Sequence, residues 1–225
     1  MLARIIFQDN CCYLNNFNIS NSNIALRFAL NNTIGELNVC QAILARRSVR
    51  AYTSEKVEVK KIRSLIEAAV RAPTAMHLEP WAFAIIQDKL FLKQMSDIAK
   101  VKLTNEFKQP LDLNDALNQP SFNVFYDANT LIVICGNTKN PDATADCWMA
   151  AQNLMLAAHA LGLGSCVITQ ALPALNDKNI KSQLGITEDY EAIAPIVIGY
   201  SDTETQVSRR KRPIILTWLD AESED

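Results

Sequence analysis

Glycine and histidine are scarce in this chain of 225 residues, which contains six glycines and two histidines. Loops that cradle phosphates need several closely spaced glycines, and neither the P-loop pattern nor the dinucleotide-binding pattern occurs. The two histidines, His77 and His159, form no zinc-type pair, and no Gly-x-Ser-x-Gly elbow or triad accompanies them. The sequence therefore argues against nucleoside-triphosphate chemistry, a metal site and acid-base hydrolysis.

Long apolar runs and a strong charge excess are also missing. No apolar stretch approaches the roughly 20 residues that cross a bilayer, and residues 1–7 are too short, and broken by Arg4, for a signal-peptide core. The net charge of -2 and the pI near 5.8 give no general attraction for polyanions. We therefore expect a cytoplasmic protein without a membrane or nucleic-acid partner.

The cysteines lack the paired spacing of a metal site, and several lie in apolar runs where a reduced thiol acts as a small hydrophobic group. A disulfide framework is not expected at this size. The six cysteines are Cys11, Cys12, Cys40, Cys135, Cys147 and Cys166.

The periodicity of the chain predicts a single α+β domain over residues 36–225, preceded by an extension of unreadable role over residues 1–35. The extension is rich in asparagine, with one short strand expected near residues 24–30. Helices are expected from residue 36 to the basic cluster at 46–50 and over about 59–70, 89–108, 143–161 and 173–184. Strands are expected at 81–87, 131–135 and 192–200, with an extended piece at 214–218 and a polar connection or lid at 110–120.

Two of these elements are the most distinctive. The run 131–135 is wholly apolar, which predicts a strand covered on both faces at the sheet centre. The stretch 143–161 is apolar nearly all round, which predicts a buried central helix stopped by Gly162 and Gly164. His159 lies on this helix and is read as a core histidine, whereas His77 lies in a loop between a helix end and a strand, a common place for binding residues.

Two basic clusters stand at opposite ends of the domain, at residues 46–50 and 209–212. Arginine guanidinium groups and a serine hydroxyl suit the oxygens of a phosphate monoester. The alternative is that these cations only complement a helix dipole and solvate the surface. Composition alone leaves both interpretations open.

Three segments together resemble the nitroreductase family of flavoproteins. They are the motif Arg46-Arg47-Ser48-Val49-Arg50-Ala51-Tyr52, the stretch from Ala72-Pro73-Thr74 to Pro80-Trp81, and the long apolar run 150–166 with its glycine exit. Residues 184–186, residues 194–200 and the basic stretch before Pro213 follow in the order that the family shows. The resemblance covers residues 36–219, and it favours the phosphate interpretation of the basic clusters.

The resemblance implies a three-layer α/β/α fold with a central mixed, mainly antiparallel sheet, in an intertwined homodimer that binds flavin mononucleotide (FMN). Thr74, Ala75 and His77 would come from the other subunit to the pyrimidine edge of the flavin, and no side chain need act as a nucleophile. Compared with the family pattern, His77 and Glu79 replace an asparagine and a glutamine, and Thr169-Gln170 stand where a glycine is common. The implied cofactor-binding residues are Arg46, Arg47, Ser48, Arg50, Thr74, Ala75, His77, Val167, Ile168, Arg209 and Lys211.

The implied reaction is a ping-pong transfer of hydride from NAD(P)H through flavin N5 to an electron-poor small molecule such as a nitroaromatic, a quinone or an enone. Arg50, with His77 as a helper, would stabilise the negative charge of the reduced ring. Two alternatives stay open. One is a flavin-binding carrier or sensor without turnover; the other is a specialised relative that acts on reduced flavin, halogenated tyrosines or peptide-derived rings.

Overall fold

The computed structural model describes residues 38–106, 117, 119, 121–203 and 210–219. Its centre is a four-stranded sheet in the order β1-β2-β4-β3, in which every neighbouring pair is antiparallel. The strands are β1 (Trp81–Ile86), β2 (Thr130–Asn137), β3 (Gly164–Val167) and β4 (Tyr190–Gly199). One parallel bridge, between Ser48 and Ser165, adds the segment after the first helix to the β3 edge.

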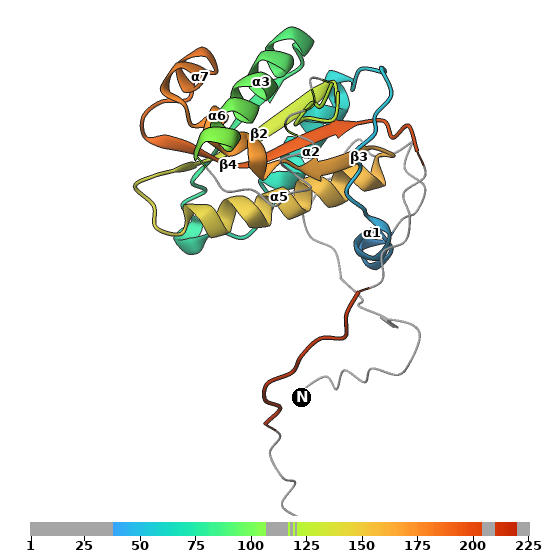
Figure 1. Ribbon diagram of the computed structural model, residues 1–225. Coiled ribbons are helices and arrows are strands. Elements are labelled where there is room, and N and C mark those ends of the chain that lie inside the picture. The colour runs from blue at the N-terminus through green and yellow to red at the C-terminus, as the bar shows by residue number, and fades with distance from the viewer. Residues whose placement is uncertain (1–37, 107–116, 118, 120, 204–209, 220–225) are drawn as a thin grey trace, which may run out of the picture.

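Helices cover both faces of this sheet, so the predicted three-layer architecture is confirmed (Figure 1). On one face, α5 (Ala143–Ala160) packs against α2 (Val59–Ala69), with the short α1 (Val39–Ala45) near the end of α5. On the other face lie α3 (Lys89–Glu106), α6 (Leu172–Leu175) and α7 (Lys178–Gln183). Each face has its own core cluster of buried apolar side chains.

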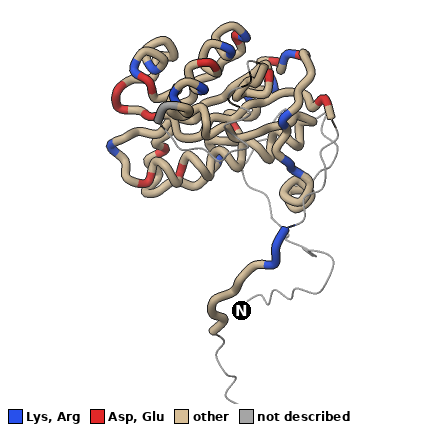
Figure 2. Tube along the Cα trace, viewed as in Figure 1, with Lys and Arg blue, Asp and Glu red and all other residues tan. Residues whose placement is uncertain are grey.

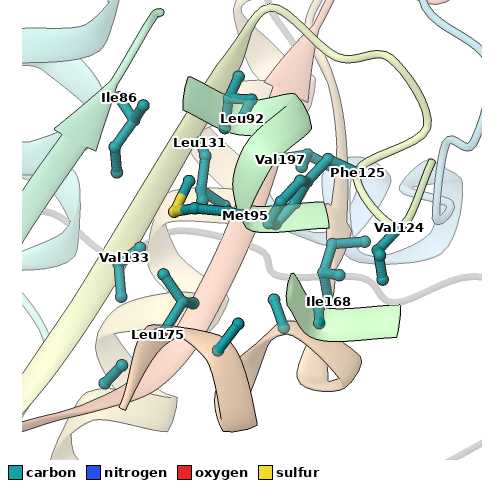
Figure 3. Packing of buried hydrophobic residues seen from close by; sticks show 14 of the residues in the cluster. Ile86, Leu92, Met95, Val124, Phe125, Leu131, Val133, Ile168, Leu175 and Val197 are labelled. Atoms are coloured by element: carbon teal, nitrogen blue, oxygen red, sulfur yellow. The ribbon is translucent and has the colours of Figure 1, made fainter. Parts of the chain in front are cut away.

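The sheet centre forms where the sequence is most apolar. Strand β2 is buried over Thr130–Gly136 because it pairs on both sides and is covered on both faces. Its alternate side chains enter the two cores: Leu131 and Val133 pack with Phe125 and Met95 under α3 (Figure 3). The predicted central strand is therefore confirmed.

Helix α5 buries side chains along its whole length, from Ala143 to Ala158, but Thr144, Ala145, Met149 and Gln152 are exposed. The burial predicted from its uniform apolarity is therefore confirmed for the side that faces the core and not all round. Its end is marked by Gly162, whose φ of 73° lies in the left-handed region that glycine adopts at helix ends. Gly164 does not act as a second stop. It begins β3 instead, because a residue without a side chain is needed where β3 passes close to Val49.

The helix predicted over 173–184 is wrong as a single element, because it divides into α6 and α7. Asn176 lies between them and pairs with the backbone of Ala192 on β4, donating from Nδ2 at 3.1 Å and accepting at Oδ1 at 2.8 Å. Asp177 then caps α7 by accepting from Asn179 N. Short polar side chains that bond backbone groups compete with a continuous helix.

Other predictions fall at the chain ends and connections. The extended piece at 214–218 has no strand pairing in the described residues, and its apolar side chains are exposed. The extension 1–35, the strand near 24–30 and most of the connection 110–120 lie outside the described residues. Within the described chain four cysteines are free, and three of them are buried, as expected for structural thiols.

Candidate functional site

The segment carrying the first basic cluster is fixed along the free edge of β3. Val49 N donates to Ser165 O at 3.0 Å, and Ser48 forms the parallel bridge with Ser165. Val49 is buried against Gly164, where a Cβ would lie 2.8 Å from Val49 Cβ. Side chains alternate along an extended segment, so burial of Val49 leaves Ser48 and Arg50 exposed on the other side.

The guanidinium groups of this cluster are crowded and partly buried. The pKa of Arg46 is lowered by burial and by the nearby charges of Arg210 and Arg47. Arg47 donates from Nη1 to Leu44 O at 2.6 Å and to Arg46 O at 2.8 Å, and its Nε is buried without a partner. In the part of the chain that the structure describes, no carboxylate forms an ion pair with Arg46, Arg47 or Arg210. Figure 2 shows where basic and acidic residues lie along the Cα trace, with a basic segment directly beside α1. Crowded cations without a carboxylate partner are suited to bind an anion.

His159 belongs to this neighbourhood, which corrects its interpretation as a core histidine. It lies in the last turn of α5, is only half-buried and belongs to neither core cluster. Its pKa is lowered by burial and then by the charges of Arg46 and Arg47. No sequence pattern indicated this, because the electrostatic effect acts between segments more than 100 residues apart.

Two tyrosines, Tyr52 and Tyr126, interact with Arg50. Its guanidinium carbon lies 6.0 Å from the centre of the Tyr126 ring, within the range of a cation–π interaction. Tyr52 donates its hydroxyl to Val49 O at 2.7 Å, and burial raises its pKa. Burial also raises the pKa of the Cys166 thiol, although Arg50 opposes the shift. Tyr126 was not a predicted site residue, and only its position after a long connection could have suggested it.

Val167 and Ile168, two of the predicted cofactor-binding residues, have different environments. Val167 is half-buried at the end of β3, on the side of the sheet covered by α5. Ile168 is 1% exposed and packs in the core with Phe125 and Val124 (Figure 3). The side chain of Ile168 therefore supports this edge from behind and does not line it.

The loop that carries Thr74, Ala75 and His77 includes a short 3-10 turn, Ala75–His77. Its backbone is unusual, because Met76, His77 and Glu79 have φ values of 51°, 54° and 44° without being glycine. Met76 and His77 are exposed at the tip. Both features are common where a loop serves in binding.

Within one chain this loop and the basic cluster lie far apart. Ala75 N contacts Asp146 in the first turn of α5, whereas Arg46 and Arg47 act on His159 in its last turn. These two residues of α5 are 13 positions apart, so the helix separates them by about 20 Å. The two groups of predicted residues stand near opposite ends of the same helix (Figure 1).

The second basic cluster is only partly described. Arg209 lies outside the described residues, and Lys211 is exposed. Arg210, which was not among the predicted residues, is the one that affects Arg46. Among the described residues, no group of His, Cys, Asp and Glu could hold a metal ion. None of their helices is long and apolar enough to span a membrane.

Comparisons with known proteins agree with this architecture. A protein of Archaeoglobus fulgidus, named provisionally as an NADH dehydrogenase/NAD(P)H nitroreductase, is 28% identical over 167 residues, which cover 72% of this chain and 84% of the relative. A crystal structure of a nitroreductase with bound FMN from Bacteroides fragilis superposes with a TM-score of 0.71 at 25% identity, covering 81% of this chain and 98% of the other.

A structure of an iodotyrosine deiodinase bound to FMN and 3-iodo-L-tyrosine shares the fold, with a TM-score of 0.66 at 20% identity, covering 79% of this chain and 97% of the deiodinase. The fold therefore occurs with more than one named activity. The nitroreductase family matches residues 43–200, from the last part of α1 to the residue after β4. That span is well over half of the chain, and the chain belongs to the nitroreductase family.

Proposed function

We propose that this protein is a cytoplasmic FMN-dependent oxidoreductase that uses NAD(P)H to reduce an electron-poor small molecule. Family membership supports the class of enzyme, and FMN is bound in related structures such as that from Bacteroides fragilis. The name of the Archaeoglobus fulgidus relative supports the nicotinamide reductant. The chemistry that FMN supplies when bound is hydride exchange, with a nitroaromatic, quinone or enone as the acceptor class.

The observation that carries the proposal is the crowded cation cluster at Arg46 and Arg47. Burial lowers the pKa of Arg46, and the nearby charges of Arg210 and Arg47 lower it further. Without a carboxylate partner among the described residues, this crowding of cations favours an anion between them. A phosphate monoester would accept charge-assisted hydrogen bonds from these groups and from the exposed Ser48 hydroxyl. We assign Arg46, Arg47 and Ser48 to the phosphate end of FMN, with Arg210 beside the predicted Arg209 and Lys211.

The ring end of the cofactor is assigned to Arg50 and to the loop with Thr74, Ala75 and His77. Arg50 is exposed and lies against the Tyr126 ring, so its cation is available to a ligand at this edge. Positive charge there would favour the reduced, anionic ring. His77 would serve as a hydrogen-bonding helper. Val167 would flank the ring, while Ile168 supports it from the core.

We propose that each site is completed by a second copy of the chain. The separation of about 20 Å along α5 places the loop out of reach of its own basic cluster, so the loop of one subunit would serve the cluster of the other. Large apolar side chains are exposed on the elements concerned, as expected for surfaces that are covered in a dimer. They are Val39, Ile43 and Leu44 on α1, Met76 and Leu78 on the loop, and Ile214, Ile215, Leu216, Trp218 and Leu219 near the C-terminus.

The first experiment is an absorbance spectrum of the purified protein with FMN, before and after anaerobic addition of NADPH and NADH. We expect flavin bands that bleach with a nicotinamide and return with a quinone. Bands that persist would mean a flavin carrier or sensor without turnover. If the protein takes up no FMN, the proposal is wrong.

The phosphate assignment is tested by FMN affinity in Arg46→Ala, with Arg63→Ala on the exposed side of α2 as the matched control. Loss of a hydrogen bond to a charged group costs about 1.5–3 kcal/mol, so we expect roughly 10- to 100-fold weaker binding in Arg46→Ala. The control should bind FMN as the unaltered protein does. Equal affinity in both variants would remove Arg46 from the site.

A further inference from the structure

Asp146 is a buried acidic residue that the family resemblance did not mark. It lies in the first turn of α5 and is 2% exposed. Each of its carboxylate oxygens lies 3.3 Å from Ala75 N and accepts from that backbone amide. A buried carboxylate is costly unless it is hydrogen-bonded, and a backbone N–H that binds one gains a charge-assisted bond. The contact therefore joins α5 to the loop.

The loop itself has few other means of keeping its shape. Met76, His77 and Glu79 hold a left-handed backbone that is unfavourable for residues with side chains. The local bonds are Leu78 N to Ala75 O at 3.1 Å, His77 N to Thr74 O at 3.4 Å and the long bond from Glu79 N to Thr74 Oγ1 at 3.4 Å. A strained conformation persists only where its surroundings impose it. Asp146 supplies such a constraint from outside the loop.

Helix α5 is a suitable anchor because it is fixed by both the sheet and α2. Cys147 and Ala150, which follow Asp146, are fully buried in the core between α5 and the sheet. Two turns further along, Asn153 Nδ2 donates to Ala68 O at the end of α2, at 3.3 Å. The end of α2, which leads into the loop, and the loop itself are thus both hydrogen-bonded to α5.

We propose that Asp146 is a positioning residue that sets the conformation of the loop 74–79, and thereby the place where Thr74, Ala75 and His77 meet the flavin of the partner subunit. Asp146 would act through the Ala75 amide and would not touch the ligand. The inference rests on the proposed function for its effect on the cofactor. Its effect on the loop does not depend on any ligand.

The test compares Asp146→Ala and Asp146→Asn with Asp142→Ala as the matched control. Asp142 is exposed at the N-cap of the same helix and makes no side-chain cap bond, so its loss removes the same charge near the same helix end without freeing the loop. An asparagine at 146 keeps an oxygen that can accept from Ala75 N, whereas an alanine does not. The readouts are amide hydrogen exchange of residues 75–79, FMN affinity, and the spectrum and reduction rate of bound flavin.

We expect exchange in the loop to accelerate roughly 10- to 100-fold in Asp146→Ala, with weaker FMN binding and an altered flavin spectrum. Asp146→Asn should recover most of each change, and Asp142→Ala should match the unaltered protein. A role in general stability alone would not change the loop and the flavin spectrum selectively. Unchanged loop exchange and flavin properties in Asp146→Ala would overturn the inference.

A second variant approaches the same bond from the loop side. Ala75→Pro removes the N–H donor, and Thr74 already has the extended backbone, φ -132° and ψ 148°, that a residue before proline prefers. If Asp146→Ala does not fold, Ala75→Pro tests the role of Asp146 in its place. Faster amide exchange in the loop would support that role, and unchanged exchange would contradict it. A protein that takes up no FMN would refute the proposed function while loop exchange still tests the role of Asp146.

Discussion

Replacing Gly164 by alanine tests how tightly the basic segment is held against β3. A Cβ at this position would lie 2.8 Å from both Cβ and Cγ2 of Val49 and 2.9 Å from Cγ1. Rotation of Val49 cannot relieve the contact, because its Cβ is fixed to the backbone and a branched side chain always points a carbon toward the intruder. Val49 N also bonds Ser165 O at 3.0 Å. The segment must therefore shift away from the strand.

Overpacking of this kind typically costs about 1–3 kcal/mol, and replacing a strand glycine returns about 0.5–1 kcal/mol of backbone entropy. We therefore expect Gly164→Ala to lower the free energy of unfolding by about 1–2 kcal/mol in urea titration. Because the shift displaces the arginines on either side of Val49, FMN affinity should also fall by roughly tenfold. Adding Val49→Ala to Gly164→Ala should partly restore the stability and the FMN affinity, since it removes two of the three close atoms.

Gly162→Ala is the matched control, two residues earlier in the same connection. Its φ is 73° and a Cβ there would meet nothing within 4 Å, so alanine adds only backbone strain of about 1–2 kcal/mol. We expect lower stability with unchanged FMN affinity in the folded protein. If Gly164→Ala keeps both the stability and the affinity of the unaltered protein, the close packing of Val49 on β3 is not a determinant of the site.

Two further predictions concern the surroundings of the arginines. In the folded protein the pKa of His159 lies below its ordinary value near 6.5. As the pH falls below about 6.5, the unfolded chain therefore binds a proton at His159 before the folded protein does. The free energy of unfolding should decrease over this pH range, down to the pKa of His159 in the folded protein. His159→Gln should flatten this part of the pH profile in urea titrations, and an unchanged slope would contradict a pKa lowered by burial and by the charges of Arg46 and Arg47. Tyr52→Phe removes the 2.7 Å bond to Val49 O and should cost about 1 kcal/mol in the same titration, with a loss below about 0.3 kcal/mol excluding that bond as a support.

The sequence by itself determined the layers of the fold and the family. Uniform apolarity is enough to place β2 at the sheet centre, because a strand without a polar face is stable only when both faces are covered. It also indicates that α5 packs on the core, although part of its surface is exposed. The end of α5 was predictable because its signal, Gly162, is local. The first helix, expected from residue 36, begins at Val39 after the Asn38–Gln41 capping box, which is also a local signal. The order of the motifs indicated nitroreductase membership without any tertiary information, and the match over residues 43–200 confirms it.

Only the tertiary structure decided which distant residues meet. In the sequence His159 is one more residue of an apolar helix, and only the fold shows that the charges of Arg46 and Arg47 act on it. In the sequence Asp146 is an acidic residue near the start of a helix, and only the fold shows that its carboxylate accepts a hydrogen bond from Ala75 N. Similarly, the bond from Asn176 to Ala192, which divides a predicted helix, joins groups that no local pattern relates. Periodicity reports which side of an element is buried, whereas the partners of a polar or charged side chain depend on the complete path of the chain.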